Sequence, residues 1–177
     1  MGRDWQCRSL YLQIYKQMAD FKNIDKKIAN LERYIRTELP TIIGVEGVNH
    51  FKESFQNEGF TDRNLQKWPQ VKRRTATSPW YGFKYGSNKI SNAATSRKIL
   101  TGESGALADS IRWKLYANGI RFIAATKYAK IQNEGGEVKV FGRATKRIPA
   151  RKFMGDSEKL RKRIVDIVIK DFKRIMK

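Results

Sequence analysis

The side chains best suited to acid–base or nucleophilic chemistry are few in this sequence and lie far apart. His50 is its single histidine and Cys7 its single cysteine. A catalytic zinc ion takes three protein ligands, and no second ligand follows His50 one helical turn later, so a zinc site is not expected. We interpret His50 as an ordinary helix residue. A lone Cys7 allows no internal disulfide and fits a reducing cytosol.

Two glycine-containing segments partly match known catalytic loops. "GESGA" (102–106) has the serine of a nucleophile elbow, but Ala106 stands at the second glycine position and no strand is predicted before it. "TGESG" (101–105) lacks the Lys-Ser/Thr ending of a phosphate-binding loop. The acidic residues are scattered among cations, so no metal-binding cluster is expected. The sequence therefore predicts neither enzyme activity nor a cofactor. A hydrolase or nuclease with convergent acids is kept as a minor alternative.

Positive charge is the strongest signal in the composition. In 177 residues, 37 lysines and arginines oppose 17 acidic residues, which gives a formal net charge of +20. Such an excess predicts attraction to phosphate, to acidic proteins or to an anionic surface, without deciding among them. The candidate phosphate contacts are Lys72, Arg73, Arg74, Arg143, Lys146 and Arg147. Because no helix-turn-helix, zinc-finger or RNP-type motif occurs, the alternative function is a basic nucleic-acid-binding module with non-specific DNA contact.

No targeting or membrane segment is recognised. No apolar run approaches the ~20 residues of a membrane span. The start "MGRDWQCRSL" lacks the apolar stretch of a signal peptide, and Gln6 breaks the myristoylation pattern. We expect a soluble protein made in the cytoplasm.

Two N-terminal helices are predicted from apolar spacing. The first spans residues 10–39 and is expected to end at Pro40, which lacks a backbone N–H. Its expected buried stripe consists of Ile14, Met18, Phe21, Ile28, Leu31 and Ile35. In the second, "VEGVNHFKESFQNEGF" (45–60), Val48, Phe51 and Phe55 share a face and Gly59 offers a stop.

The segment 69–105 has neither helical nor strand periodicity. It is rich in small polar and basic residues, yet it contains Trp80, Tyr81, Phe83 and Tyr85, which a plain linker does not need. Loops of this length are uncommon in compact domains and are usually functional or disordered. We predict a long extended arm that becomes ordered against a partner.

The last third of the chain predicts strands followed by a helix. In 111–126, apolar and basic residues alternate on both sides of Asn118-Gly119, which favours a β-hairpin with a tight turn. "EVKVF" (137–141) is a predicted third strand. A final amphipathic helix begins near Ser157, after a capping sequence. Its expected buried stripe consists of Leu160, Ile164, Ile167, Val168, Phe172 and Ile175.

These elements predict an α+β fold. It consists of a small antiparallel sheet with a β-hairpin, packed by N-terminal helices and a C-terminal amphipathic helix, with the arm in addition. The expected parts of this single domain are an N-terminal helical region (1–68), the arm (69–105) and the hairpin sheet with the last helix (106–177).

Three short motifs occur in order in the C-terminal half. In "ILTGESGALADSI" the notable residues are Leu100, Gly102, Leu107, Ser110 and Ile111. In "YAKIQNEGG" they are Tyr128, Ala129, Ile131 and Gly135. In "IPARKFMG" they are Ile148, Pro149, Ala150, Arg151, Phe153 and Gly155. Taken in this order, the motifs resemble the phage virion morphogenesis, or tail-completion, family, and the resemblance spans about residues 98–173. It departs from the family pattern at Gln132, Asn133, Lys152 and Met154.

The third motif is interpreted as a strap before the last helix. Pro149 fixes φ and favours an extended Ile148, Phe153 is expected to anchor the helix on the sheet, and Gly155 permits a sharp turn. Arg151 can bind a carboxylate or carbonyl pair, either within the fold or on a neighbouring subunit. The intramolecular brace is the preferred interpretation of this strap.

The resemblance implies a structural protein of the tailed-phage neck or tail end, which completes the tail and joins it to the head. It also implies self-association in an oligomeric ring such as a hexamer, with other neck, connector or tail proteins as partners. The expected location is the virion, after assembly in the host cytoplasm. The expected interface and motif residues are Leu107, Tyr128, Ala129, Pro149, Arg151, Phe153, Gly155, Trp80, Tyr81, Phe83 and Tyr85.

Overall fold

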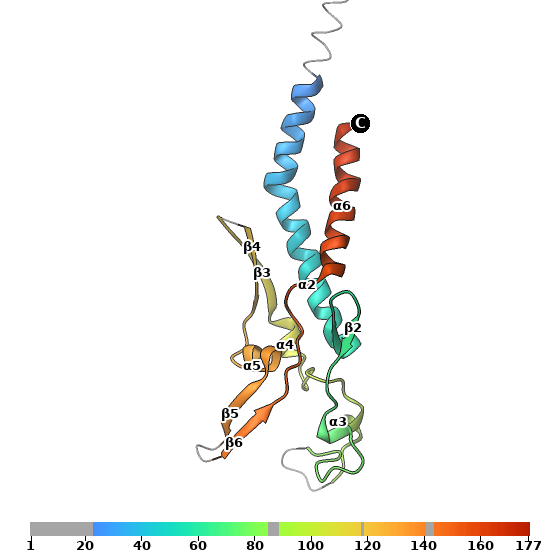
Figure 1. Cartoon of the computed structure of the whole chain (residues 1–177), viewed down its shortest axis with the longest axis vertical. Coiled ribbons are helices and arrows are strands. Elements are labelled where there is room, and N and C mark those ends of the chain that lie inside the picture. Colours follow the sequence, from blue (N-terminus) through green and yellow to red (C-terminus); the bar gives the residue numbers. More distant parts are fainter. Residues whose placement is uncertain (1–22, 85–88, 118, 141–143) are drawn as a thin grey trace, which may run out of the picture. The chain divides into compact units, whose positions relative to one another are not determined.

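The computed structural model describes residues 23–84, 89–117, 119–140 and 144–177 (Figure 1). Several residues used in the sequence predictions lie outside these ranges. They are Cys7, Ile14, Met18, Phe21, Tyr85, Asn118, Phe141 and Arg143. The predicted α+β class is confirmed: the structure combines helices with small two-stranded antiparallel sheets.

The element bounds are as follows. After a helical stretch at 23–33 come η1 (Tyr34–Glu38), α2 (Leu39–Asn57), β1 (Gly59–Thr61), β2 (Leu65–Lys67), η2 (Lys72–Arg74), α3 (Asn92–Ser96), α4 (Ala106–Asp109), β3 (Ile111–Tyr116), β4 (Gly119–Ala124), α5 (Ala129–Glu134), β5 (Gly136–Val140), β6 (Ala144–Ile148) and α6 (Glu158–Met176). They divide into two compact units, one containing residues 23–41 and 165–177 and the other residues 42–164.

The predicted hairpin is confirmed, but the third strand has a different partner from the one expected. β3 pairs with β4 in a register that sets Ile111 opposite Ala124 and Trp113 opposite Phe122. β5 pairs with β6 rather than with this hairpin. Among the described residues the strands therefore form three separate two-stranded sheets in place of one small sheet.

The expected helix end at Pro40 is wrong. Helical structure continues from residue 23 to Asn57 through Pro40, and a π-helical turn, η1, lies directly before the proline. In this turn the Leu39 N–H donates to the carbonyl of Tyr34, five residues earlier. A wider turn relieves the clash of a proline ring with the carbonyl four residues before it, so the helix tolerates Pro40.

In the first unit, the helical residues 23–41 run antiparallel to residues 165–177, which contain the last part of α6 (Figure 1). Lys27 Nζ donates to the carbonyl of Met176 at 2.9 Å, and Tyr34 Oη donates to Asp171 Oδ2 at 3.1 Å. Burial, with this hydrogen bond, raises the pKa of Tyr34. The predicted stripes are partly wrong here, because Ile28, Ile35 and Phe172 are exposed while Tyr34 is buried. The apolar side chains of each helix extend around more of its circumference than one partner helix can cover.

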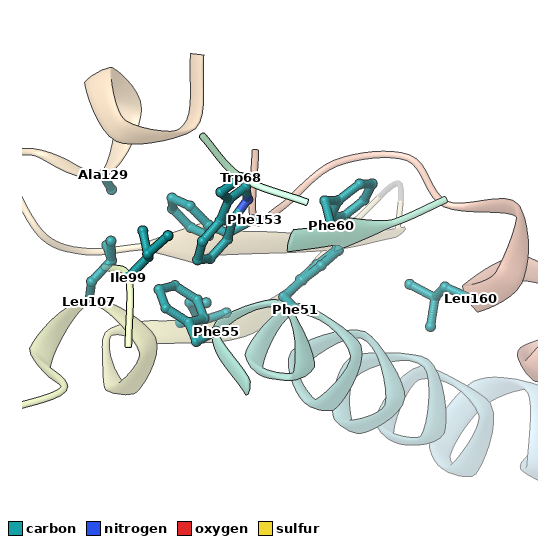
Figure 2. Packing of buried hydrophobic residues seen from close by; sticks show 10 residues of the cluster. Phe51, Phe55, Phe60, Trp68, Ile99, Leu107, Ala129, Phe153 and Leu160 are labelled. Atoms are coloured by element: carbon teal, nitrogen blue, oxygen red, sulfur yellow. The ribbon is translucent and has the colours of Figure 1, made fainter. Parts of the chain in front are cut away.

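The hydrophobic core of the second unit joins α2 to segments from the rest of that unit (Figure 2). It contains Phe51, Phe55, Phe60, Trp68, Ile99, Leu107, Ile111, Ala129, Phe153 and Leu160. The ring of Phe55 packs edge-on against Trp68, with centroids 5.6 Å apart, and lies tilted against the ring of Phe153, with centroids 5.3 Å apart. Such pairs add about 0.5–1.5 kcal/mol to the burial of apolar area.

Two glycines of α2 let the β3–β4 hairpin lie directly on the helix backbone. A Cβ added at Gly44 would overlap the ring of Trp113, and one at Gly47 would overlap the ring of Phe122. The Phe122 ring also contacts Phe51 edge-on, at 5.1 Å between centroids. The apolar face of the hairpin is thus held by α2, and its other face is left to the solvent.

Candidate functional site

The strap at 148–157 is fixed to α2, α5 and Trp68 by hydrogen bonds of its backbone. The Arg151 N–H donates to the carbonyl of Gln132 at 2.8 Å. Asn133 Oδ1 accepts from the N–H groups of Phe153 and Met154, at 2.9 and 3.1 Å. Trp68 Nε1 donates to the carbonyl of Lys152 at 2.7 Å, and Ser54 Oγ donates to the carbonyl of Phe153 at 3.3 Å. The strap is therefore an integral part of the core.

Arg151 is buried, and its guanidinium group bonds within the fold. Both Nε and Nη2 lie 3.3 Å from the carbonyl oxygen of Pro69, the residue at which the segment 69–105 begins. Loss of solvent lowers the pKa of Arg151, yet not so far that the group loses its charge at neutral pH. This geometry corresponds to the intramolecular brace, which connects the strap to the 69–105 segment.

Phe153 is fully buried, and its ring lies 5.3 Å from that of Phe55 in α2, within the core cluster that also contains Trp68 and Phe60. Gly155 has φ +153°, which favours glycine. Ser157 then caps α6: its Oγ accepts from the N–H of Leu160 at 3.1 Å and donates to the carbonyl of Thr61 at 2.9 Å. The strap thus places the start of α6 against β1.

The other motif residues fall into two groups. Leu107 and Ala129 are buried in the same core as Phe153, so the three motifs converge there (Figure 2). Tyr128 and Pro149 lie at the surface. Most of the motif pattern therefore maintains the core, and Tyr128 is the large side chain of these motifs that a partner can reach.

The described part of 69–105 contains local structure. Arg73 donates from Nη2 to the carbonyls of Arg97 and Lys98, at 2.8 and 3.0 Å, and from Nη1 to that of Ala94. These bonds connect η2 to the end of α3. Trp80, Tyr81 and Phe83 are exposed, and the rings of Trp80 and Phe83 meet edge-on at 5.2 Å.

The expected phosphate contacts differ in their availability. Arg73 is engaged as just described, and Arg74 Nη1 binds Glu58 Oε1 at 2.6 Å. Burial alone raises the pKa of Glu58, but bonds from the Ile99 N–H and from Arg74 outweigh it and lower that pKa. Lys72, Lys146 and Arg147 are exposed. For them phosphate contact stays a prediction.

A group of cations that was not predicted from the sequence lies on the exposed face of the β3–β4 hairpin. Lys114 and Arg121 lie directly opposite each other, and Arg112 is on the same face two residues along. The Arg121 guanidinium carbon lies 4.5 Å from the centroid of the Tyr116 ring. Like charges directly opposite in a sheet are unfavourable, so this face is suited to a bound anion. The alternation of apolar and basic residues that predicts the hairpin is also the sequence feature that could have identified these cations.

His50 is buried in α2. Its Nε2 lies 3.0 Å from the carbonyl oxygen of Thr61, and it donates there in the neutral form. The described residues contain no group of three His, Cys, Asp or Glu side chains that could hold a metal ion. No helix in the described ranges is long and apolar enough to cross a membrane.

The described residues thus expose a hairpin, several surface aromatic side chains and a cationic face, and surface features of this kind are common in binding interfaces. Residues 66–173, more than half of the chain, match the model of the phage virion morphogenesis family. The chain belongs to this family, which is one of phage structural and assembly proteins and so associates the chain with the virion. No curated protein and no solved structure matches the chain.

Proposed function

We propose that the protein completes the tail of a tailed phage and joins it to the head, as a subunit of an oligomeric ring at the neck or tail end. The family match over 66–173 carries this proposal, since it covers all three motifs whose residues meet in the core. A joining role requires a rigid body with exposed surfaces for several neighbours, and no catalytic step.

Two surfaces of the second unit suit such neighbours. In the described part of the chain, β3 and β4 pair only with each other, so each keeps a free edge that a strand of another subunit can extend. Leu115, near the hairpin tip, is 60% exposed. Trp80 and Phe83 form the second surface, because exposed aromatic side chains are the usual anchors of protein interfaces.

The test is complementation of a phage genome from which this gene has been deleted. We expect free heads and separate tails by electron microscopy, joined virions with the wild-type gene, and few joined virions with Leu115→Asp. Lys127→Asp, at another exposed position, is the matched control and should restore joining. Joined, infectious virions in the absence of the gene would contradict the proposal. The molar mass of the purified protein, measured by light scattering at low and at high salt, tests whether the protein forms a closed ring.

A second candidate function is non-specific contact with DNA, which the opposed pair Lys114 and Arg121 favours. A phosphate between the two strands would remove their repulsion, and the ring of Tyr116 beside Arg121 would limit the motion of the guanidinium group. This contact is compatible with a position at the neck, through which the genome passes.

A further inference from the structure

The outer edge of β4 offers backbone groups that no described residue uses. The Ala125 N–H donates to the Ser110 carbonyl at 3.4 Å, which extends the β3–β4 pairing by one step and fixes its phase. Because the direction of the backbone groups alternates along a strand, Ile120 and Phe122 direct their N–H and C=O groups away from β3. Within the described ranges these groups have no hydrogen-bond partner. An extended chain can therefore pair with β4 along this edge.

A groove of about 480 Å³ lies beside this edge. Its walls are β4 on one side and the strap with the first turns of α6 on the other, and all its lining residues belong to the second unit. Its volume falls within the range of about 300–1,000 Å³ that is usual for ligand pockets. The groove can thus receive apolar side chains of a chain that pairs with β4. Its apolar lining consists of Phe51, Ile120, Phe122, Met154, Leu160 and Ile164.

Each wall of the groove carries an arginine. Arg121 belongs to β4 and Arg161 to α6, and both are exposed. Neither forms an ion pair with a residue of the described ranges. Asp156 also lines the groove, so two cations and one anion leave the lining with a charge of +1. Lys114, opposite Arg121 on the hairpin, adds to this positive charge.

The two faces of β4 determine which side chains fit a strand paired with it. Phe122 lies on the face that packs on α2, whereas Arg121 lies on the opposite, exposed face. The side chains of an added strand alternate between the same two faces. Those on the face of Phe122 enter the apolar groove, and those on the face of Arg121 lie beside its cation. Apolar residues suit the first position, and aspartate or glutamate suits the second.

A second copy of this chain does not suit the β4 edge. Every charged strand in the described ranges contains lysine or arginine. The β3 edge of another copy would bring Arg112 and Lys114 towards Arg121, and like charges on neighbouring strands are unfavourable. DNA can contact the exposed cations, but it has no apolar side chain for the groove and no backbone that pairs with a strand. An acidic protein segment meets all three requirements.

We propose that the β4 edge and this groove bind an extended segment of a partner protein in which apolar residues alternate with aspartate or glutamate. The inference rests on the proposed joining role, which supplies the partner, and it specifies the chemistry of that partner. Main-chain hydrogen bonds to Ile120 and Phe122 hold the segment, and its apolar side chains fill the groove. Its carboxylates lie near Arg121 and Arg161.

The first test measures binding of a model peptide to the full-length purified protein by fluorescence anisotropy. The probe is a fluorescein-labelled peptide of alternating glutamate and leucine, ELELELE. The control, LLLEEEE, has the same composition and charge without the alternation. We expect the alternating peptide to bind roughly tenfold tighter or more. No binding of the alternating peptide, or equal binding of both peptides, would overturn the inference. Complementation of the deleted gene tests the joining role separately, so the two failures are distinguishable.

Methylated peptides test whether the segment pairs as a strand. In one peptide the leucine amides carry N-methyl groups, and in the other the amides of the last three glutamates carry them. Only one of these two sets of N–H groups faces β4, because the direction alternates along a strand. One peptide should lose binding roughly tenfold or more, while the other should bind like the unmethylated peptide. Equal effects of the two methylations would overturn strand pairing.

Two measurements on the protein side locate the site. Arg121→Glu with Arg161→Glu should weaken binding of ELELELE roughly tenfold or more. Lys127→Glu with Lys130→Glu changes the net charge equally at exposed positions outside the groove and should have a much smaller effect. In the wild-type protein, amide exchange of Ile120 and Phe122 should slow when the peptide binds. Unchanged exchange at both residues, or equal weakening by the two double variants, would overturn this location.

Discussion

Asn133 connects the second family motif to the strap through a single oxygen atom. Its Oδ1 accepts the two backbone N–H groups that flank the Phe153 carbonyl group, while the N–H of Arg151 bonds the neighbouring Gln132 carbonyl. The departure from the family pattern at this position therefore falls on a residue with an architectural role. A side-chain amide supplies an acceptor that an apolar residue cannot.

We expect Asn133→Ala to lower the free energy of unfolding by about 1–3 kcal/mol, because two partly buried N–H groups lose their acceptor. Asn133→Asp retains an oxygen at the same place and should stay within about 1 kcal/mol of wild type. Urea unfolding followed by tryptophan fluorescence measures both. Equal losses in the two variants would show that the hydrogen bonds are not what Asn133 contributes.

His50 gives the second unit a pH dependence of defined sign. Desolvation lowers its pKa, and it outweighs the hydrogen bond to Thr61 and the nearby charge of Glu53, which act in the opposite direction. Arg163 and Lys159 lower the pKa further. The folded chain therefore resists protonation of His50, whereas the unfolded chain binds a proton near pH 6.5.

Stability should be complete above about pH 6.5 and should fall as the pH is lowered from 7 towards 5, with a slope of at most about 1.4 kcal/mol per pH unit for one proton. His50→Gln removes the titrating group while keeping an amide donor for Thr61. Its unfolding free energy should be flat over this range. A wild-type curve that is flat between pH 7 and 5 would contradict the assignment.

At the scale of elements, the contact between α2 and the hairpin sets two effects against each other. Gly44 and Gly47 are poor helix formers, and alanine at either would favour the helix by about 1 kcal/mol. The same methyl group would overlap Trp113 or Phe122. Overpacking of this kind costs about 1–3 kcal/mol, so the steric effect should dominate.

Gly47→Ala should therefore destabilise the protein and loosen the hairpin, which thermal unfolding and amide exchange of β3 and β4 would measure. Combining it with Phe122→Ala makes room for the methyl group. The double variant should be less destabilised than the sum of the two single ones. Asn49→Ala, at an exposed position of α2, is the control for helix propensity alone. Strict additivity would show that the ring does not lie on Gly47.

The same elements show what can be read from sequence. The β3–β4 hairpin was predictable because its apolar face alternates with a basic face. β6, "ATKRI", has no such alternation and was missed, so β5 was left without its partner. The helix end predicted at Pro40 is wrong because a π-helical turn before the proline relieves its steric clash, and the spacing of apolar residues does not reveal such a turn. The sequence shows Arg112, Lys114 and Arg121, but only the register of the hairpin shows that Lys114 and Arg121 lie opposite each other.

At the scale of the whole molecule, a net charge of +20 attracts any polyanion, so weak DNA binding alone would say little about a built surface. The salt dependence separates general attraction from defined contacts. Each phosphate neutralised by a cation adds about 0.9 to the slope of log K against log salt. Three cations on one hairpin face should therefore make a measurable contribution to this salt slope.

We expect duplex DNA of random sequence to bind with a steep salt slope. Replacing Arg112, Lys114 and Arg121 with glutamine should reduce that slope by about three, because three phosphate contacts are lost. The control replaces three scattered exposed lysines, Lys26, Lys127 and Lys162, and removes the same charge. It should weaken binding while changing the slope much less. Equal slopes in both triple variants would mean that the hairpin face is no phosphate site, and its opposed cations would then be left for an acidic protein partner.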